Sequence, residues 1–275
     1  MAVLDDKVAI VTGSARGIGR ATAELLSEQG AKVLINDLDG DVAKQTASEI
    51  AGQTLVFAGD LTQPGVPDEL IQKVIDEWGK VDILVNNAGY TLDTPIHKMT
   101  DEWFQRMLDI HTIVPFRMCR AVAPHMREPA KKEREEGREV FRKIVNVSSI
   151  SGTMGNPGQA NYSSGKAGVV GLTKTLAKEW GQFKVNVNAV AFGYIETRLT
   201  ASKDESNVTE IGGEQIQLGI PDQMRQLAPM LIPLGRPGTP REAAGGVFFL
   251  CSPWANFVHG QVLNITGGQF SGMTT

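Results

Sequence analysis

Seven short apolar runs recur along the chain, at residues 7–12, 31–37, 54–58, 82–86, 143–148, 184–190 and 261–265. Segments long enough for helices separate the first six. Near-continuous apolar runs are typical of strands buried on both faces, and strands that alternate with helices form a parallel sheet. Because such crossovers are right-handed, we predict a doubly wound α/β fold of the Rossmann type. It would have about seven parallel strands, helices on both faces, and a ligand at the carboxyl ends of the strands.

Two segments interrupt this alternation. Residues 127–143 carry seven basic and five acidic side chains, which is typical of a solvated helix or a mobile loop with i,i+4 ion pairs. A contact with a partner subunit or an acidic ligand is the alternative. Residues 198–232 are rich in polar side chains, and a long insertion near a site often acts as a lid over the substrate. Neither segment resembles an interdomain linker, so residues 1–275 are expected to form a single domain.

The composition argues against nucleic acid and membranes as binding partners and against a metal site. A net charge of −4 argues against a general affinity for nucleic acid. No apolar run approaches the roughly 20 residues of a membrane span, so no membrane partner is expected. Cys119 and Cys251 lie far apart in the sequence and form no C-x-x-C or metal-type spacing. We therefore expect two free thiols in a reducing cytoplasm. The four histidines have no metal-ligand spacing. We therefore expect a cytoplasmic protein without a metal.

The first apolar run leads into a glycine-rich turn and then a helix. Gly13, Gly17 and Gly19 form this turn, and the helix runs on to Gly30. Glycines let the backbone approach a phosphate closely, and the unpaired N–H groups at a helix start bind a pyrophosphate. The spacing is G-x-x-x-G-x-G, which departs from the usual G-x-G-x-x-G. Asp37 ends the second run, eighteen residues after Gly19, where a carboxylate accepts hydrogen bonds from an adenosine ribose.

A phenol and an amine stand four residues apart, at Tyr162 and Lys166, with Ser149 thirteen residues before the phenol. On a helix these two positions share a face, so the ammonium lies beside the phenol. A nearby cation lowers the pKa of a phenol from about 10. Lowering it to about 7 takes roughly 4 kcal/mol, which Lys166 and a positively charged nicotinamide ring are expected to supply. The Ser149 hydroxyl is placed to hold a substrate oxygen.

Four motifs in this order and spacing resemble the short-chain dehydrogenase/reductase family: Thr12-Gly13-x-x-x-Gly17-Ile18-Gly19, Asn86-Asn87-Ala88-Gly89, Ser149 and Tyr162-x-x-x-Lys166. The resemblance implies a dinucleotide-binding domain that transfers hydride between nicotinamide and a carbonyl or secondary alcohol. It implies that Tyr162 exchanges the proton, that Lys166 tunes Tyr162 and binds the nicotinamide ribose, and that Ser149 holds the substrate oxygen. The cofactor contacts that it implies are Gly13, Arg16, Gly17, Ile18, Gly19, Asp37, Asp60, Leu61, Asn87, Ala88, Gly89, Tyr162, Lys166, Gly193, Ile195 and Thr197.

Two residues give opposing indications about the cofactor. Asp37 would accept from both ribose hydroxyls of NAD and would repel the 2′-phosphate of NADP. Arg16 holds a place where a basic residue often accompanies NADP in this family. Two unit charges about 4 Å apart interact by roughly 4 kcal/mol at an effective dielectric near 20. The carboxylate is therefore expected to dominate, which favours NAD over NADP.

The chain departs from the family at two positions. His111 stands where the family commonly has the Asn that completes the proton relay, and Phe192 precedes Gly193 where a Pro is common. An imidazole can continue a relay through water and, unlike an amide, it titrates near neutral pH. His111 is therefore a fourth candidate catalytic residue. A core histidine bound by the backbone is the alternative.

Several segments resemble enzymes that act on the 3-position of an acyl thioester. His111 and residues 35–41 resemble the 3-hydroxyacyl-CoA dehydrogenase unit of the type 2 multifunctional enzyme, and residues 152–162 and 195–197 resemble 3-oxoacyl-acyl-carrier-protein reductases. An acyl thioester is the expected substrate, with a sugar, a steroid or a cyclic alcohol as the alternative. A catalytically silent nucleotide-binding regulator is the rival from another class. The family also implies a homo-oligomer, a tetramer or a dimer, formed through helices near residues 101–126 and 160–180, and we expect a homotetramer.

Overall fold

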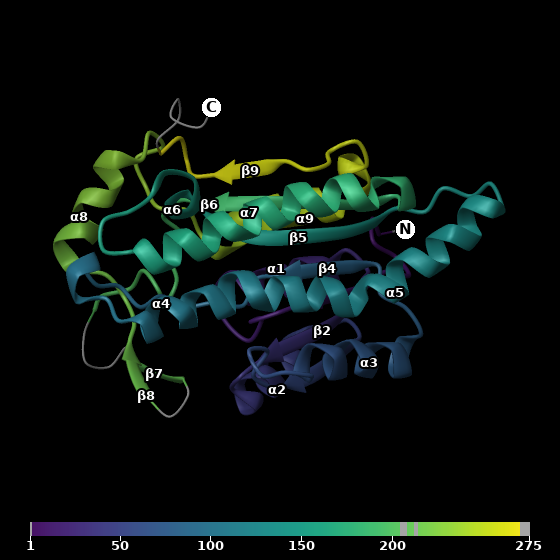
Figure 1. Ribbon diagram of the computed structural model, residues 1–275, viewed down its shortest axis with the longest axis horizontal. Helices are drawn as coiled ribbons and strands as arrows, with labels where there is room; N and C mark the ends of the chain where they lie inside the picture. Colours follow the sequence, from purple (N-terminus) through teal and green to yellow (C-terminus); the bar gives the residue numbers. More distant parts are fainter. Residues whose placement is uncertain (1, 204–207, 212–213, 270–275) are drawn as a thin grey trace.

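A computed structural model describes residues 2–203, 208–211 and 214–269 of the chain. Seven strands form one parallel sheet in the order β3-β2-β1-β4-β5-β6-β9 (Figure 1). The order reverses between β1 and β4, which confirms the doubly wound fold, and each strand lies within two residues of its predicted bounds. The strands are β1 (Val8–Val11), β2 (Lys32–Asp37), β3 (Thr54–Ala58), β4 (Ile83–Asn86), β5 (Arg142–Ser149), β6 (Val185–Phe192) and β9 (Val262–Ile265).

Helices cover both faces of the sheet because alternate side chains of each strand point to opposite faces. Along β1, Val8 and Ile10 belong to one buried apolar cluster, and Ala9 and Val11 belong to the other. Helices α3, α5 and α7 contribute side chains to the first cluster, and helices α1, α2 and α9 contribute to the second. The helices are α1 (Gly17–Glu28), α2 (Gly40–Glu49), α3 (Val66–Trp78), α4 (Asp101–Leu108), α5 (Val114–Glu135), α6 (Ile150–Met154), α7 (Ala160–Trp180), α8 (Asp222–Leu231) and α9 (Pro240–Cys251).

Two features lie outside this regular framework. A single turn of π-helix, Asp109–Ile113, joins α4 to α5, and such turns are frequent at functional sites. The predicted lid contains α8 and a hairpin of two antiparallel strands, β7 (Val208–Ile211) and β8 (Glu214–Gln217). The hairpin was not predicted from the sequence.

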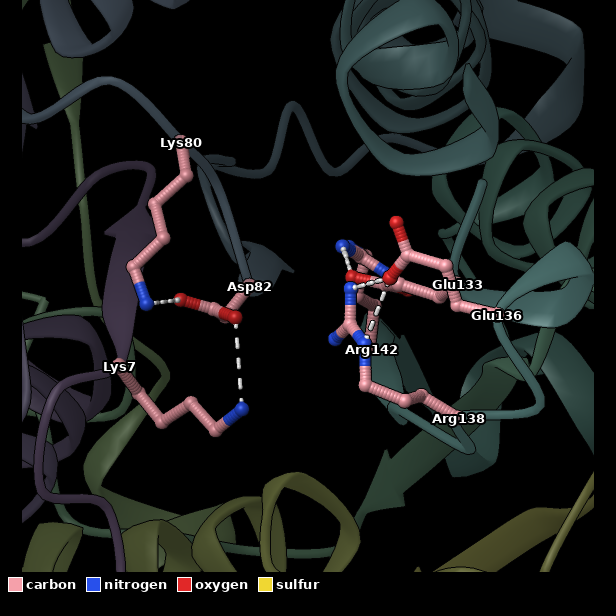
Figure 2. Close-up of polar contacts among 7 residues, drawn as sticks. All are labelled: Lys7, Lys80, Asp82, Glu133, Glu136, Arg138 and Arg142. Atoms are coloured by element: carbon pink, nitrogen blue, oxygen red, sulfur yellow. Dashed lines mark hydrogen bonds and ion pairs between the residues drawn. The ribbon is translucent and has the colours of Figure 1, made fainter. Parts of the chain in front are cut away.

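The charged segment 127–143 is mostly a continuation of α5. The helix runs to Glu135, the chain turns at Gly137 with a φ of 69°, and it re-enters the sheet at Arg142. The Arg142 guanidinium donates two hydrogen bonds of 2.8 Å to Glu133, and only 8% and 13% of the two side chains is exposed (Figure 2). The prediction of a solvated helix therefore holds for only part of this segment. The enclosed ion pair between Glu133 and Arg142 fixes the end of α5 to the start of β5.

Another polar cluster ties the amino ends of the central strands together. The buried Asp82 carboxylate accepts from the backbone N–H of Val8 at 2.9 Å. It also pairs with Lys7 and Lys80 (Figure 2). These contacts stabilise the end of the sheet opposite to the strand ends where a ligand is expected. None of the helices in the described residues combines the length and the apolar run needed to cross a bilayer.

Candidate active site

A cleft of about 1290 Å³ opens at the carboxyl ends of the strands. The structure brings every residue that the sequence nominated to this one cleft, although they come from segments far apart in the chain. The nominated residues that line it are Gly13, Arg16, Gly17, Ile18, Gly19, Asp37, Asp60, Leu61, Asn87, Ala88, Gly89, His111, Ser149, Tyr162, Lys166, Gly193, Ile195 and Thr197.

The glycine turn after β1 is packed too closely for side chains. A Cβ atom at Gly13 would lie 2.7 Å from Cα of Ala88, and one at Gly19 would lie 2.2 Å from the Gly13 carbonyl oxygen. The Asn87 amide donates to the carbonyls of Thr12 and Gly13 at 2.9 Å, which fixes the turn against the end of β4. The amino end of α1 therefore faces the cleft with its N–H groups, as a pyrophosphate site requires.

Acidic side chains lie where β2 and β3 end. Asp37 accepts a hydrogen bond from the backbone N–H of Ala15 at 3.2 Å, which places its carboxylate beside the glycine turn. Arg16 pairs with Asp39 at 2.9 Å, and this contact lowers the pKa of Asp39. Burial raises the pKa of Asp60, but hydrogen bonds from Thr62 and Gln63 outweigh it and keep the pKa below its ordinary value. This end of the cleft therefore carries negative charge.

Ser149, Tyr162 and Lys166 converge at the other end. Ser149 ends β5 and caps α6, accepting from the N–H of Ser151 at 3.1 Å, and it also forms a hydrogen bond with Tyr162. Tyr162 and Lys166 lie one turn apart on α7, with Nζ 5.7 Å from the centre of the phenol ring. The ammonium donates to the Val147 carbonyl at 2.7 Å, which fixes it behind the phenol.

Burial shifts the pKa values of both Tyr162 and Lys166. Burial raises the pKa of Tyr162 to about 12, although the hydrogen bond with Ser149 opposes this shift. Burial lowers the pKa of Lys166 to about 7. Without a nicotinamide ring the phenol therefore shows no net lowering of its pKa, because desolvation of both groups dominates; the expected lowering with the ring present stays a prediction. Tyr162 is a neutral phenol at neutral pH, which is the form that can donate a proton.

His111 lies in the π-turn and packs on the phenol. The two rings are perpendicular with centres 4.9 Å apart, and a Cβ at Gly89 would come within 2.4 Å of the imidazole Cε1. Nε2 lies 2.8 Å from the Tyr90 carbonyl, so it carries the proton. Nδ1 is buried and has no hydrogen-bond partner among the described residues. Burial and then the Lys166 charge lower the pKa of His111 well below 6.5, which contradicts the expected titration near neutral pH.

The segment after β6 closes the cleft. The Gly193 N–H donates to Ile265 at 3.0 Å, and a Cβ at Gly193 would lie 3.0 Å from Cα of Thr266. Ile195 then pairs with Gly238 as an isolated bridge. Ile195 and Thr197 both line the cleft, and Thr197 lies beside the glycine turn, where a Cβ at Gly17 would be 3.6 Å from its Cγ2.

Sequence reasoning missed several residues of the cleft. Asp39 was not nominated, although it lies two residues beyond Asp37 and was visible as a second acid. Gln159 donates to Asp93 and accepts from Ser151, both at 2.9 Å, in the lining of the cleft, and its position three residues before Tyr162 was the available signal. Arg106 reaches the cleft from α4, and no pattern in the sequence indicated it.

Comparison with known proteins agrees with these motifs. Residues 13–269 match the protein family described as enoyl-(acyl carrier protein) reductase. The chain is 38% identical over 267 residues to the 3-oxoacyl-(acyl-carrier-protein) reductase FabG of Vibrio cholerae, covering 97% of this chain and 98% of that one. The proteins of the same name from Aquifex aeolicus and Escherichia coli are 39% and 36% identical, over the same shares of both chains. The chain belongs to the short-chain dehydrogenase/reductase family.

Members of this family are oxidoreductases that use a nicotinamide cofactor, and the chain is one of them. Its residues fit such a group. The glycine turn leaves a cradle that a Cβ would fill, the amino end of α1 can hold the pyrophosphate, and Lys166 lines the same cleft with its ammonium held by the Val147 carbonyl. Within the described residues, no group of three or more His, Cys, Asp or Glu side chains is arranged to hold a metal.

Proposed function

We propose that this enzyme reduces the 3-oxo group of an acyl thioester to a 3-hydroxyl, with NADH as the reductant. One observation carries the proposal: a complete Ser149, Tyr162 and Lys166 set lies in the cleft of a chain whose named relatives are 3-oxoacyl-(acyl-carrier-protein) reductases. The large cleft, with Leu199, Leu218 and Ile220 in its lining, offers apolar surface for an acyl chain. These relatives also support the acyl carrier protein as the carrier.

The chemistry divides between the cofactor and the side chains. A bound nicotinamide supplies hydride to the carbonyl carbon. Tyr162, as a neutral phenol, donates its proton to the carbonyl oxygen, and the Ser149 hydroxyl holds that oxygen beside it. Lys166 keeps its position through the Val147 carbonyl and stabilises the negative charge that develops on the phenol. Hydride and proton together convert the ketone to a secondary alcohol.

A substrate panel tests this function. The loss of NADH absorbance is followed with acetoacetyl and longer 3-oxoacyl thioesters on coenzyme A and on acyl carrier protein. Crotonyl thioester tests reduction of a carbon–carbon double bond, which the family description raises, and sugars and cyclic ketones test the other substrate classes. We expect turnover with 3-oxoacyl thioesters alone. Preferential turnover of crotonyl thioester, or of a ketone that is not a thioester, would contradict the proposal, and silence with every class would favour the regulator.

The preference for NAD rests on the charge at the end of β2. Asp37 and Asp39 place two carboxylates there, and Arg16 already pairs with Asp39, so less of its charge is free for a 2′-phosphate. Replacing Asp37 by Ala removes the carboxylate that opposes NADP. We expect the ratio of kcat/KM for NADPH to that for NADH to rise at least about tenfold, equivalent to about 1.4 kcal/mol.

Two further variants control that measurement. Asp37→Asn keeps an oxygen that can accept from Ala15, so it should shift the ratio without loosening the turn. Asp41→Asn removes a nearby exposed charge on α2 and should leave the ratio unchanged. A wild-type enzyme that already prefers NADPH would show that Asp37 does not set the preference.

We propose that His111 extends the proton relay as a neutral ring. Its Nδ1 is buried and has no hydrogen-bond partner among the described residues, so it can accept a hydrogen bond directly or through water. His111→Asn restores an acceptor and should keep turnover within about fivefold of wild type. His111→Leu removes it and should lower kcat about tenfold, the effect of one lost hydrogen bond. Because the ring stays neutral, neither variant should change the pH profile between pH 6 and 9. Wild-type kcat in both variants would assign His111 to packing alone.

We propose that the chain acts as a single domain in a cytoplasmic homotetramer. Phe116 on α5 is 43% exposed and Val170 on α7 is partly exposed, which supports contact through those helices. Light scattering with size-exclusion chromatography tests the assembly, and a stable monomer at micromolar concentration would contradict it.

Cys119 and Cys251 are both free and buried, and burial raises the pKa of each thiol to about 12, so neither is poised for redox chemistry.

A further inference from the structure

The hairpin β7–β8 contacts the body of the protein through one face of β8. Ile216 and Leu218 are both buried, and they join the apolar cluster that includes Met107 and the partly buried Leu199. Glu214 lies two residues before Ile216, so it lies on the same face of the strand. Its carboxylate meets Arg106 of α4 at 2.6 Å. These two residues are 108 positions apart in the sequence, and they connect the hairpin to the helix across the cleft.

The ion pair with Arg106 holds one end of the hairpin, and a separate group of hydrogen bonds holds the other end. Its base is held by Ile220, whose N–H donates to Ala201 at 3.0 Å, and by Arg198, which donates to the Val208 carbonyl at 3.0 Å. Glu214 begins β8 at the opposite end. The Arg106 side chain is 19% exposed and that of Glu214 is 58% exposed. A pair this exposed is weak and is screened by salt, so it can break and re-form without unseating the buried residues.

We propose that Arg106 and Glu214 form a latch that holds the hairpin over the substrate end of the cleft. The latch adds to the proposed function by making the hairpin a wall for the acyl chain, since Val208 and Leu218 line the cleft. Arg106 is a positioning residue here, because it acts through the hairpin. Its second contact, from Nε to the Tyr90 hydroxyl at 3.4 Å, orients the guanidinium toward the hairpin. A closed latch favours long acyl chains, which reach this wall, over short ones, which do not.

Hydrogen exchange of the protein without ligands tests the latch independently of the substrate. Glu214→Gln should speed exchange in the peptide that covers residues 214–220 by about threefold to fivefold, while peptides of β4 and β5 stay unchanged. Glu102→Gln is the matched control, because Glu102 lies 3.9 Å from Arg106 but on the same helix, so it cannot tie the hairpin down. Raising the salt concentration should speed exchange in wild type and have little further effect in Glu214→Gln.

A double-mutant cycle connects the latch to its partner. Arg106→Gln should reproduce the faster exchange, and adding Glu214→Gln to it should change nothing more. Tyr90→Phe removes the hydrogen bond between Arg106 and the Tyr90 hydroxyl and should give a smaller effect. Equal exchange in Glu214→Gln and Glu102→Gln would overturn the latch, as would simple additivity in the cycle.

Chain-length selectivity then tests the wall. The ratio of kcat/KM for a 3-oxodecanoyl thioester to that for acetoacetyl thioester should fall about threefold to fivefold in Glu214→Gln and stay constant in Glu102→Gln. Faster exchange without turnover of any 3-oxoacyl thioester would refute the proposed substrate and leave the latch standing. Turnover with unchanged exchange and an unchanged length ratio would refute the latch alone.

Discussion

Replacing Tyr162 by Phe should lower kcat for 3-oxoacyl reduction by about a hundredfold to ten-thousandfold, the usual contribution of a positioned proton donor. The aromatic ring and its perpendicular contact with His111 remain in the variant, so we expect the fold and the cofactor-binding site to be preserved. The affinity for NADH should therefore stay within about twofold of wild type. Stopped-flow turnover and a fluorescence titration of NADH measure the two quantities separately.

Another tyrosine of the cleft provides the matched control. Tyr194 also lines the cleft, but its hydroxyl donates to the Thr200 carbonyl at 3.1 Å, so Tyr194→Phe should change kcat by less than about threefold. The burial that raises the pKa of Tyr162 to about 12 keeps the phenol protonated between pH 6 and 9. Deprotonation of Tyr162 should therefore not lower the rate of reduction in that pH range. Near wild-type turnover in Tyr162→Phe would remove this residue from the mechanism.

The sheet and the cleft could be predicted because their signals are local and repeated. Apolar runs identified the strands, and the parallel topology then brought their carboxyl ends together. Gly13 and Gly19 were predictable for a similar reason, since a close backbone approach tolerates no Cβ. The residues that follow each strand therefore met in one cleft, even where a single motif such as G-x-x-x-G-x-G was weak by itself.

Other features depend on packing that no local pattern encodes. β8 contains one apolar residue, Ile216, between polar neighbours, so nothing distinguished it from a loop. The contact between Arg106 and Glu214 spans 108 positions, and only the folded chain brings them together. The raised pKa of Tyr162 in the protein without a nicotinamide ring could not be predicted for the same reason. A spacing of four residues indicates a neighbouring cation, but the desolvation that outweighs it is set by the surrounding core.

Lys166→Met should lower kcat about a hundredfold and weaken NADH binding, because the ammonium has two proposed roles. Met keeps an unbranched apolar stem of similar size, so α7 should retain its packing. Lys174→Met is the control on the same helix, since Lys174 is exposed and should affect neither quantity. A loss of stability with unchanged turnover would show that Lys166 only supports the helix.

The same variant makes a second prediction, about stability. Burial lowers the pKa of Lys166 to about 7 in the folded protein, whereas the unfolded value is about 10.4. Between these values the unfolded chain binds more protons, so wild type gains up to about 1.36 kcal/mol of unfolding free energy per pH unit as the pH rises. Below pH 7 both states are protonated, and the full cost of the buried charge is present. Lys166→Met lacks this group, so its unfolding free energy should equal or exceed that of wild type at pH 6. Urea unfolding should then show wild type gaining about 2 kcal/mol on the variant between pH 7 and 9, whereas parallel curves would mean that Lys166 is not desolvated in the folded state.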